Sequence, residues 1–99
     1  MIELNDGNFN EFINSPTLVA VDFHAPWCGP CRTLIPRLQS LSNKGFTIGS
    51  VNVDEQPSIT SNFNISAIPA IIIFKNGQVV NKHTGLITED GLAKLLQES

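Results

Sequence analysis

Residues 18–31 read LVAVDFHAPWCGPC, a stretch in which an apolar run leads into a pair of cysteines. Positions 18–23 are apolar at both parities except for Asp22, a pattern typical of a strand covered on both faces, as in parallel sheets. Cys28 and Cys31 follow shortly afterwards, where apolar residues begin to recur at helical spacing. The stretch therefore predicts a buried strand, a short loop, and a helix that begins at the two cysteines.

The helix predicted after Pro30 carries a single apolar stripe, made of Leu34, Ile35, Leu38 and Leu41. Gly45 suits a left-handed cap at the end of this helix. Pro36 lies inside it and is expected to produce a kink.

The rest of the chain continues to alternate between strand and helix patterns. Strands are predicted at 2–4, 48–53, 70–74 and 79–80, and helices after Asn5 or Asp6, after Pro57 and after Thr88. Asn76-Gly77 is a strong hairpin signal, because both positions of a two-residue turn favour positive φ. The order predicts an α/β fold, a three-layer sandwich with a central mixed five-stranded sheet and helices on both faces.

Composition narrows the class of protein. The 99 residues, 41% of them hydrophobic and 15% charged, predict a single domain over residues 1–99. The net charge is -3 and the six Lys and Arg residues are scattered, so we expect no nucleic-acid partner. The apolar run at 67–74 is far shorter than the roughly 18 residues of a membrane span, and residues 1–6 lack signal-peptide features. We expect a cytoplasmic monomer that does not contact a membrane.

The spacing of Cys28 and Cys31 predicts a reactive pair. Three residues apart at a helix start, their side chains share one face and lie near the separation that a disulfide needs. Closing a four-residue ring contributes only about 2 kcal/mol to stability, which favours a bridge that reacts over one that stabilises. The helix N-terminus favours an anion by up to about 2 kcal/mol. We expect Cys28 to be the nucleophile and Cys31, one turn further in, to be the resolving thiol.

Two other interpretations of the cysteine pair are an inert structural bridge and half of a zinc site. Zinc needs two further ligands, and the only histidines in the chain are His24 and His83. A closed site would have to gather both histidines around a short loop, so we expect no metal. His83 is expected on the solvated surface.

Several short motifs follow one another along the chain: VDF at 21–23, WCGPC at 27–31, Ile68-Pro69, FKNG at 74–77 and Gly85. Together they resemble the thioredoxin family over nearly the whole chain, and WCGPC is far more specific than a bare CxxC motif. The resemblance implies a thioredoxin fold and a dithiol-disulfide oxidoreductase that reduces protein disulfides and is recycled by a thioredoxin reductase. No Gly-rich phosphate loop is present, so NADPH would act through that reductase and no bound cofactor is expected.

The resemblance also gives Asp22 a role. In thioredoxins the corresponding carboxylate lies buried beneath the second cysteine, which implies that Asp22 takes the proton from Cys31. The family usually has a buried lysine on the adjacent strand, where this chain has Ser50. We therefore expect Asp22 to lack a nearby cation and to titrate above an ordinary aspartate.

Further site residues follow from the same resemblance. Gly29 and Pro30 complete the catalytic motif, and the substrate would bind to Trp27, Ile68, Pro69 and Gly85. A cis Ile68-Pro69 bond is implied, which would leave the Ile68 backbone free to pair with an extended substrate. His24 stands where the family more often has an aromatic residue. We expect a partly exposed loop histidine there; the alternative is that its charge below about pH 6.5 tunes the thiols.

Two alternative functions remain. A disulfide isomerase or oxidase would share the fold, but Pro30 argues against it, because a histidine in its place would stabilise the thiolate and make the couple more oxidising. A non-catalytic binding subunit would instead use the surface around Trp27. Replacing both cysteines by serine separates this last possibility from the enzymes.

Overall fold

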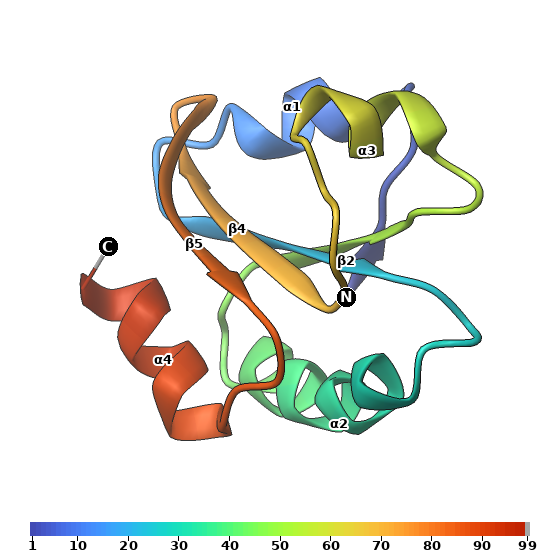
Figure 1. Ribbon diagram of the computed structural model, residues 1–99. Coiled ribbons are helices and arrows are strands. Elements are labelled where there is room, and N and C mark those ends of the chain that lie inside the picture. The colour runs from blue at the N-terminus through green and yellow to red at the C-terminus, as the bar shows by residue number, and fades with distance from the viewer. Residues whose placement is uncertain (99) are drawn as a thin grey trace.

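The computed structural model describes residues 1–98 as a central sheet between two layers of helices (Figure 1). The elements, in chain order, are β1 (Ile2–Glu3), α1 (Phe9–Ile13), β2 (Val19–His24), α2 (Gly29–Asn43), β3 (Ile48–Asn52), α3 (Pro57–Asn62), β4 (Ala70–Lys75), β5 (Gln78–Thr84) and α4 (Glu89–Glu98). The predicted alternation of strands and helices is confirmed.

The five strands are ordered β1-β3-β2-β4-β5. The β3 strand is parallel to both β1 and β2, whereas β4 runs antiparallel to β2 and β5 antiparallel to β4. Helices α1 and α3 cover one face of the sheet, and α2 and α4 cover the other (Figure 1). The mixed sheet and the three layers match the sequence prediction.

The sheet has a hydrophobic core on each face, and alternate side chains of β2 pack into one or the other. Val21 and Phe23 pack in the core on the α1 and α3 side, whereas Ala20 packs among the leucines of α2 and α4. Because successive side chains of a strand point to opposite faces, Asp22 has the same direction as Ala20. The buried carboxyl therefore belongs to the α2 layer, which is also the layer of the cysteines.

Helix α2 buries Leu34, Leu38 and Leu41 against the sheet. Ile35 was expected in the same stripe but is 37% exposed, because it lies on the flank of the helix. Pro36 lies inside the helix, which runs without interruption from Gly29 to Asn43.

The C-terminus of α2 is closed as predicted by Gly45, whose φ is 103°. The N–H of Phe46 donates to the carbonyl of Leu41 at 3.1 Å, and the N–H of Gly45 donates to the carbonyl of Ser42 at 3.1 Å. This pair of bonds is the Schellman motif, which satisfies carbonyls that the helix end would otherwise leave unpaired.

The β4–β5 hairpin turns at Asn76 and Gly77, whose φ values of 53° and 78° confirm the predicted turn. The N–H of Asn76 donates to the carbonyl of Ser15, and the N–H of Gly77 donates to that of Ile13. The hairpin is thereby fastened to the end of α1. Strand β5 extends beyond the predicted residues 79–80 to Thr84.

The start of α4 was predicted correctly, whereas the start of α1 was not. Helix α1 begins after Asn8, whereas Asn5 organises the preceding turn by accepting from the N–H groups of Gly7 and Asn8. The cap expected at Asn5 or Asp6 is therefore too early. Thr88 does open α4, since its hydroxyl accepts from the N–H of Gly91 at 3.0 Å. Within residues 1–98, no helix has the length and apolar character needed to cross a membrane.

Candidate active site

Cys28 and Cys31 form a disulfide at the start of α2, with their Cα atoms 5.3 Å apart. Cys28 is the N-cap of the helix and Cys31 lies in its first turn, so the expectation that both occupy the first turn is off by one position for Cys28. The N–H of Cys31 donates to Cys28 Sγ at 3.2 Å. A sulfur in this position receives both a direct N–H donor and the positive end of the helix dipole.

The two sulfurs lie in a small apolar cluster. Ala25, Cys28 and Cys31 are buried together, with Val53 and Ile68 packed against them. Cys28 is 5% exposed and Cys31 is 1% exposed. The first cysteine is therefore the one that a partner can reach more easily, in agreement with the order of attack expected from the sequence.

The loop before β4 approaches the disulfide from the side. The Ile68-Pro69 peptide bond is cis, as the resemblance implied, and the Ile68 carbonyl oxygen lies 3.9 Å from Cys28 Sγ. Pro69 is buried, and its carbonyl accepts from the N–H of Gly85 at 2.8 Å. This bond brings Gly85 to the same edge as Ile68.

Gly85 has a φ of 98°, a conformation that disfavours other residues. A Cβ placed on it would meet no described atom within 4 Å. Gly29 and Pro30 are exposed, and Ile68 and Gly85 are half-buried. Of the residues expected to bind the substrate, Trp27, Ile68 and Gly85 are therefore at least partly exposed, whereas Pro69 is buried.

Trp27 is 66% exposed, yet its indole is held in place. Its Nε1 donates to the Asp54 carboxylate at 2.9 Å, and the Asp54 N–H donates to the Asn52 side chain at 2.9 Å. Asp54 was not identified from the sequence. An acidic residue shortly after a strand gives no signal of a bond to a tryptophan 27 positions earlier.

Next to Trp27 and Ile68, a hollow of about 130 Å³ indents the surface. Its other lining residues come from the region between β3 and β4; they are Val53, Thr60, Ile65, Ser66 and Ala67. Val53 and Ile68 also contact the cysteine cluster, so the hollow adjoins the disulfide.

Asp22 is 1% exposed, and neither of its carboxylate oxygens has a hydrogen-bond partner among the described residues. Burial raises the pKa of Asp22 to about 7. Ser50 lies directly across from it on β3. The sequence analysis predicted that Asp22 would lack a nearby cation and would have a raised pKa, and the burial of Asp22 opposite Ser50 agrees with both expectations.

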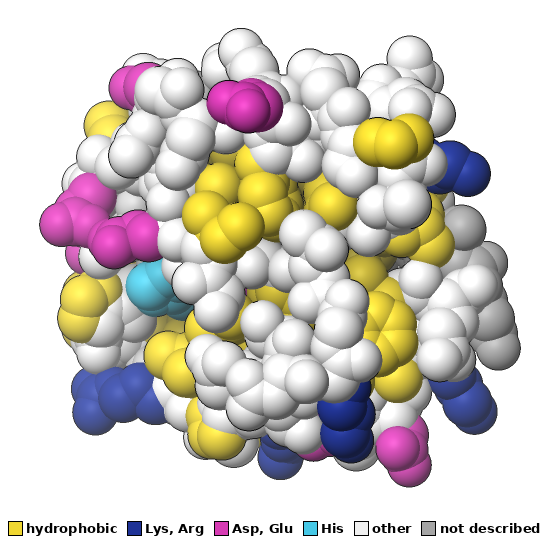
Figure 2. Space-filling view, turned by 180° about the vertical axis from the view of Figure 1, so that it is seen from behind, with side chains coloured by type: hydrophobic (Ala, Val, Ile, Leu, Met, Phe, Trp, Pro, Cys, Tyr) yellow, Lys and Arg dark blue, Asp and Glu magenta, His cyan; other side chains and the backbone are white. Residues whose placement is uncertain are grey.

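His24 ends β2 and is half-buried, so it belongs to a strand and not to the loop where it was expected. Burial lowers its pKa, and the nearby carboxylates of Glu3 and Glu55 oppose that shift. Acidic side chains gather beside a histidine at one margin of the face in Figure 2. His83 also departs from expectation, because its Nε2 is buried without a partner among residues 1–98.

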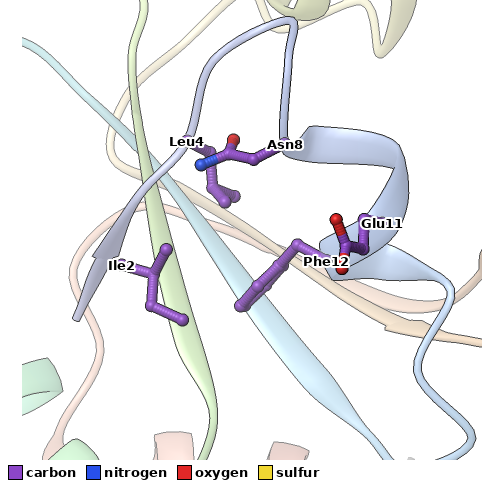
Figure 3. A pocket seen from close by; sticks show the side chains of 5 residues that line it. All are labelled: Ile2, Leu4, Asn8, Glu11 and Phe12. Carbon is purple, nitrogen blue, oxygen red and sulfur yellow. The ribbon is translucent and has the colours of Figure 1, made fainter.

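Another pocket, of about 300 Å³, opens between β1 and α1 (Figure 3). It is lined by Ile2, Leu4, Asn8, Glu11 and Phe12. It contains neither cysteine and lies on the α1 side of the sheet, whereas the disulfide belongs to the α2 side.

Within residues 1–98, no group of three or more His, Cys, Asp or Glu side chains is placed to hold a metal ion.

The three-layer fold, with a redox-active cysteine pair at the start of α2, defines a thiol-disulfide oxidoreductase. The thioredoxin family profile matches residues 1–98. The chain belongs to the thioredoxin family.

Individual relatives agree with this assignment. A thioredoxin of Chlamydia caviae is 42% identical over 93 residues, which cover 92% of this chain and 90% of that protein. A mitochondrial thioredoxin of Mus musculus is 39% identical over 89 residues, covering 87% of this chain and 54% of the mouse protein. The solved structure of a mutant thioredoxin from Halobacterium salinarum superimposes with a TM-score of 0.92 at 26% identity, covering 98% of this chain and 88% of that chain. The enzyme therefore acts on disulfides.

Proposed function

We propose that the enzyme reduces protein disulfides in two exchange steps, with Cys28 as the nucleophile and Cys31 as the resolving thiol. The observation that carries this proposal is the position of Cys28 Sγ, which accepts from the Cys31 N–H at 3.2 Å at the N-cap of a 15-residue helix. In the reduced protein the same N–H and the helix dipole favour a thiolate on Cys28.

In the first step, the Cys28 thiolate attacks one sulfur of the substrate disulfide. A bond forms between Cys28 and that sulfur, and the substrate bond breaks. The other substrate sulfur leaves as a thiolate and takes a proton from the solvent. The greater exposure of Cys28 supports its role as the attacking group.

In the second step, Cys31 gives its proton to the Asp22 carboxylate and attacks Cys28 Sγ. The Cys28–Cys31 disulfide forms, and the second substrate sulfur leaves as a thiolate. Two electrons have then passed from the cysteine pair to the substrate. Asp22 suits the task because its pKa of about 7 lies between those of an ordinary aspartate and a thiol.

The substrate segment would lie across the rim formed by Trp27, Ile68 and Gly85. The exposed indole offers apolar contact area, and the hollow beside it has room for a small apolar side chain of the substrate. The backbone of Ile68 would pair with an extended stretch of the substrate, as in strand addition.

The oxidised enzyme would be recycled by a thioredoxin reductase that draws electrons from NADPH. No cofactor bound to this chain is needed, because the cysteine pair itself carries the electrons. The enzyme would work as a monomer in a reducing compartment such as the cytoplasm, where the reductase keeps the pair in the dithiol form.

A turnover assay tests this proposal. The enzyme is mixed with a thioredoxin reductase, NADPH and a disulfide protein, and NADPH oxidation is followed for the wild type, Cys28→Ser and Cys31→Ser. We expect no turnover with either variant, and a trapped mixed disulfide with Cys31→Ser alone. Normal turnover by Cys28→Ser, or trapping through Cys31 instead, would contradict the assigned roles.

A further inference from the structure

One row of side chains crosses all five strands of the sheet. The strand registers pair Glu3 with Ser50, Ser50 with Asp22, Asp22 with Ile71, and Ile71 with His83. Paired residues in neighbouring strands point to the same face. The row therefore lies on the α2 and α4 side of the sheet, with Asp22 at its centre.

The two halves of this row differ in polarity and in exposure. Towards β1, exposure rises from Asp22, at 1%, through the half-buried Ser50 to the exposed Glu3. Towards β5, the next side chain is Ile71, which is fully buried and apolar. A proton that leaves Asp22 along this row, across the strands, can therefore reach the solvent only on the β1 side.

A hydroxyl is suited to pass a proton on, because it accepts through its oxygen and donates its own hydrogen. Neighbouring strands are about 4.8 Å apart. The Asp22 oxygens have no hydrogen-bond partner among the described residues, so a proton would pass between Asp22 and Ser50 through one bridging water molecule. Glu3, next in the row, marks where this route reaches the solvent.

The other titratable groups around Asp22 are placed differently. His24 is two residues further along the same strand on the same face, and His83 lies beyond Ile71. Cys31 belongs to the helix that covers this face, and it is the source of the proton. His24 is half-buried and is therefore the competing outlet, which the experiment must separate from Ser50.

We propose that Ser50 is the residue that connects the Asp22 carboxyl to the solvent, so that protons enter and leave the active site along the Asp22–Ser50–Glu3 row. Asp22 gives its proton to the bridging water molecule, which passes one of its own protons to the Ser50 oxygen, while the Ser50 hydroxyl hydrogen passes to a second water molecule beside Glu3. Ser50 ends unchanged, and no electrons are transferred. The inference rests on the proposed role of Asp22 as proton acceptor, and Ser50 acts as a positioning residue through it.

The test uses the oxidised protein alone, so it does not depend on disulfide reduction. A rapid jump from pH 5 to pH 8 is followed by the infrared absorption of the protonated carboxyl, which is assigned by its loss in Asp22→Asn. We expect Ser50→Val to slow deprotonation at least about tenfold. Ser50→Thr introduces a side chain of the same shape as valine but keeps the hydroxyl, so its rate should stay within about twofold of the wild type. Ser42→Ala, at another half-buried serine near the end of α2, should have no effect.

The outcomes separate the proposal from its alternatives. Equal rates for Ser50→Val and Ser50→Thr overturn it, and a slowed rate in His24→Gln with a normal rate in Ser50→Val assigns the outlet to His24. A change of equilibrium titration midpoint without a change of rate also overturns it, because a merely structural effect would act on the midpoint. Failure of the reductase assay would leave these rates unaffected, so the two proposals fail separately.

Discussion

The backbone nitrogen of Cys31 lies 3.2 Å from Cys28 Sγ, so the residue proposed to resolve the mixed disulfide also donates a hydrogen bond to the sulfur that it would attack. When Cys28 is reduced and ionised, this contact becomes a charge-assisted hydrogen bond, which is about twice as strong as a neutral one. The same residue thus contributes a donor to the first step and a nucleophile to the second.

Alkylation of the reduced protein measures the consequence for Cys28. At pH 7 we expect Cys28 to react with iodoacetamide several times faster than a free cysteine, because the N-cap position increases its thiolate fraction. Mass spectrometry of the peptides should show Cys31 modified much more slowly, since it is 1% exposed. Equal rates at the two cysteines would contradict the assignment.

The free energy of unfolding should fall as the pH rises from about 4 to about 7 and level off above that. The folded carboxyl of Asp22 keeps its proton up to about pH 7, whereas an unfolded aspartate loses it near pH 4, so the folded state binds the extra proton between these values. Asp22→Asn should raise the free energy of unfolding of the oxidised protein at pH 8 by about 2–4 kcal/mol and have little effect at pH 4. Denaturant titrations of both proteins at the two pH values provide the measurement, and a gain that does not depend on pH would rule out this cause.

A cation opposite Asp22 should reverse part of this effect. Ser50→Lys is expected to lower the pKa of Asp22 by about one unit or more, because an ammonium group close to the carboxyl favours its charged form. Ser50→Met, of similar length but neutral, should leave the pKa at or above its present value. Carbon-13 NMR of the side-chain carboxyl follows both titrations, and an equal shift in the two variants would show that packing, not charge, controls the pKa.

The bond between Trp27 and Asp54 should order the substrate rim. Asp54→Ala is expected to increase the KM for a disulfide protein by about three- to tenfold with little change in kcat, which corresponds to a net hydrogen bond of about 1 kcal/mol. Trp27 is the only tryptophan in the chain, so its fluorescence anisotropy reports directly on the loosened indole. Glu55→Ala, a neighbouring exposed acidic residue, is the matched control; a comparable KM increase there would indicate a general charge effect.

Most of the fold could be predicted because the local signals agree with one another. The apolar run through Phe23 predicted a strand buried on both faces, and Asn76-Gly77 predicted the hairpin. The errors lie where tertiary contacts determine where a helix begins or which side chains it buries. Asn5 is a residue type that often caps helices, but it stabilises the turn before α1. Ile35 has the spacing of the buried stripe, but it lies on the flank of α2.

The site was predictable where it is local in sequence and unpredictable where it is not. Cys28, Cys31 and the cis Pro69 followed from short motifs and from the family that they resemble. The contact of Asp54 with Trp27 and the place of Glu3 beside Ser50 depend on loop contacts and on strand register, which single residues do not encode. A buried histidine nitrogen at position 83 likewise had no sequence signal.

Gly85 lacks a side chain at the rim, and its positive φ makes any replacement costly. What an incoming protein meets at this point is bare main chain. Main-chain amides and carbonyls are common to every polypeptide, so contacts made here do not discriminate between partner sequences. Under the proposed binding mode, Gly85 lets the enzyme accept many different substrates, and we expect Gly85→Ala to narrow that range.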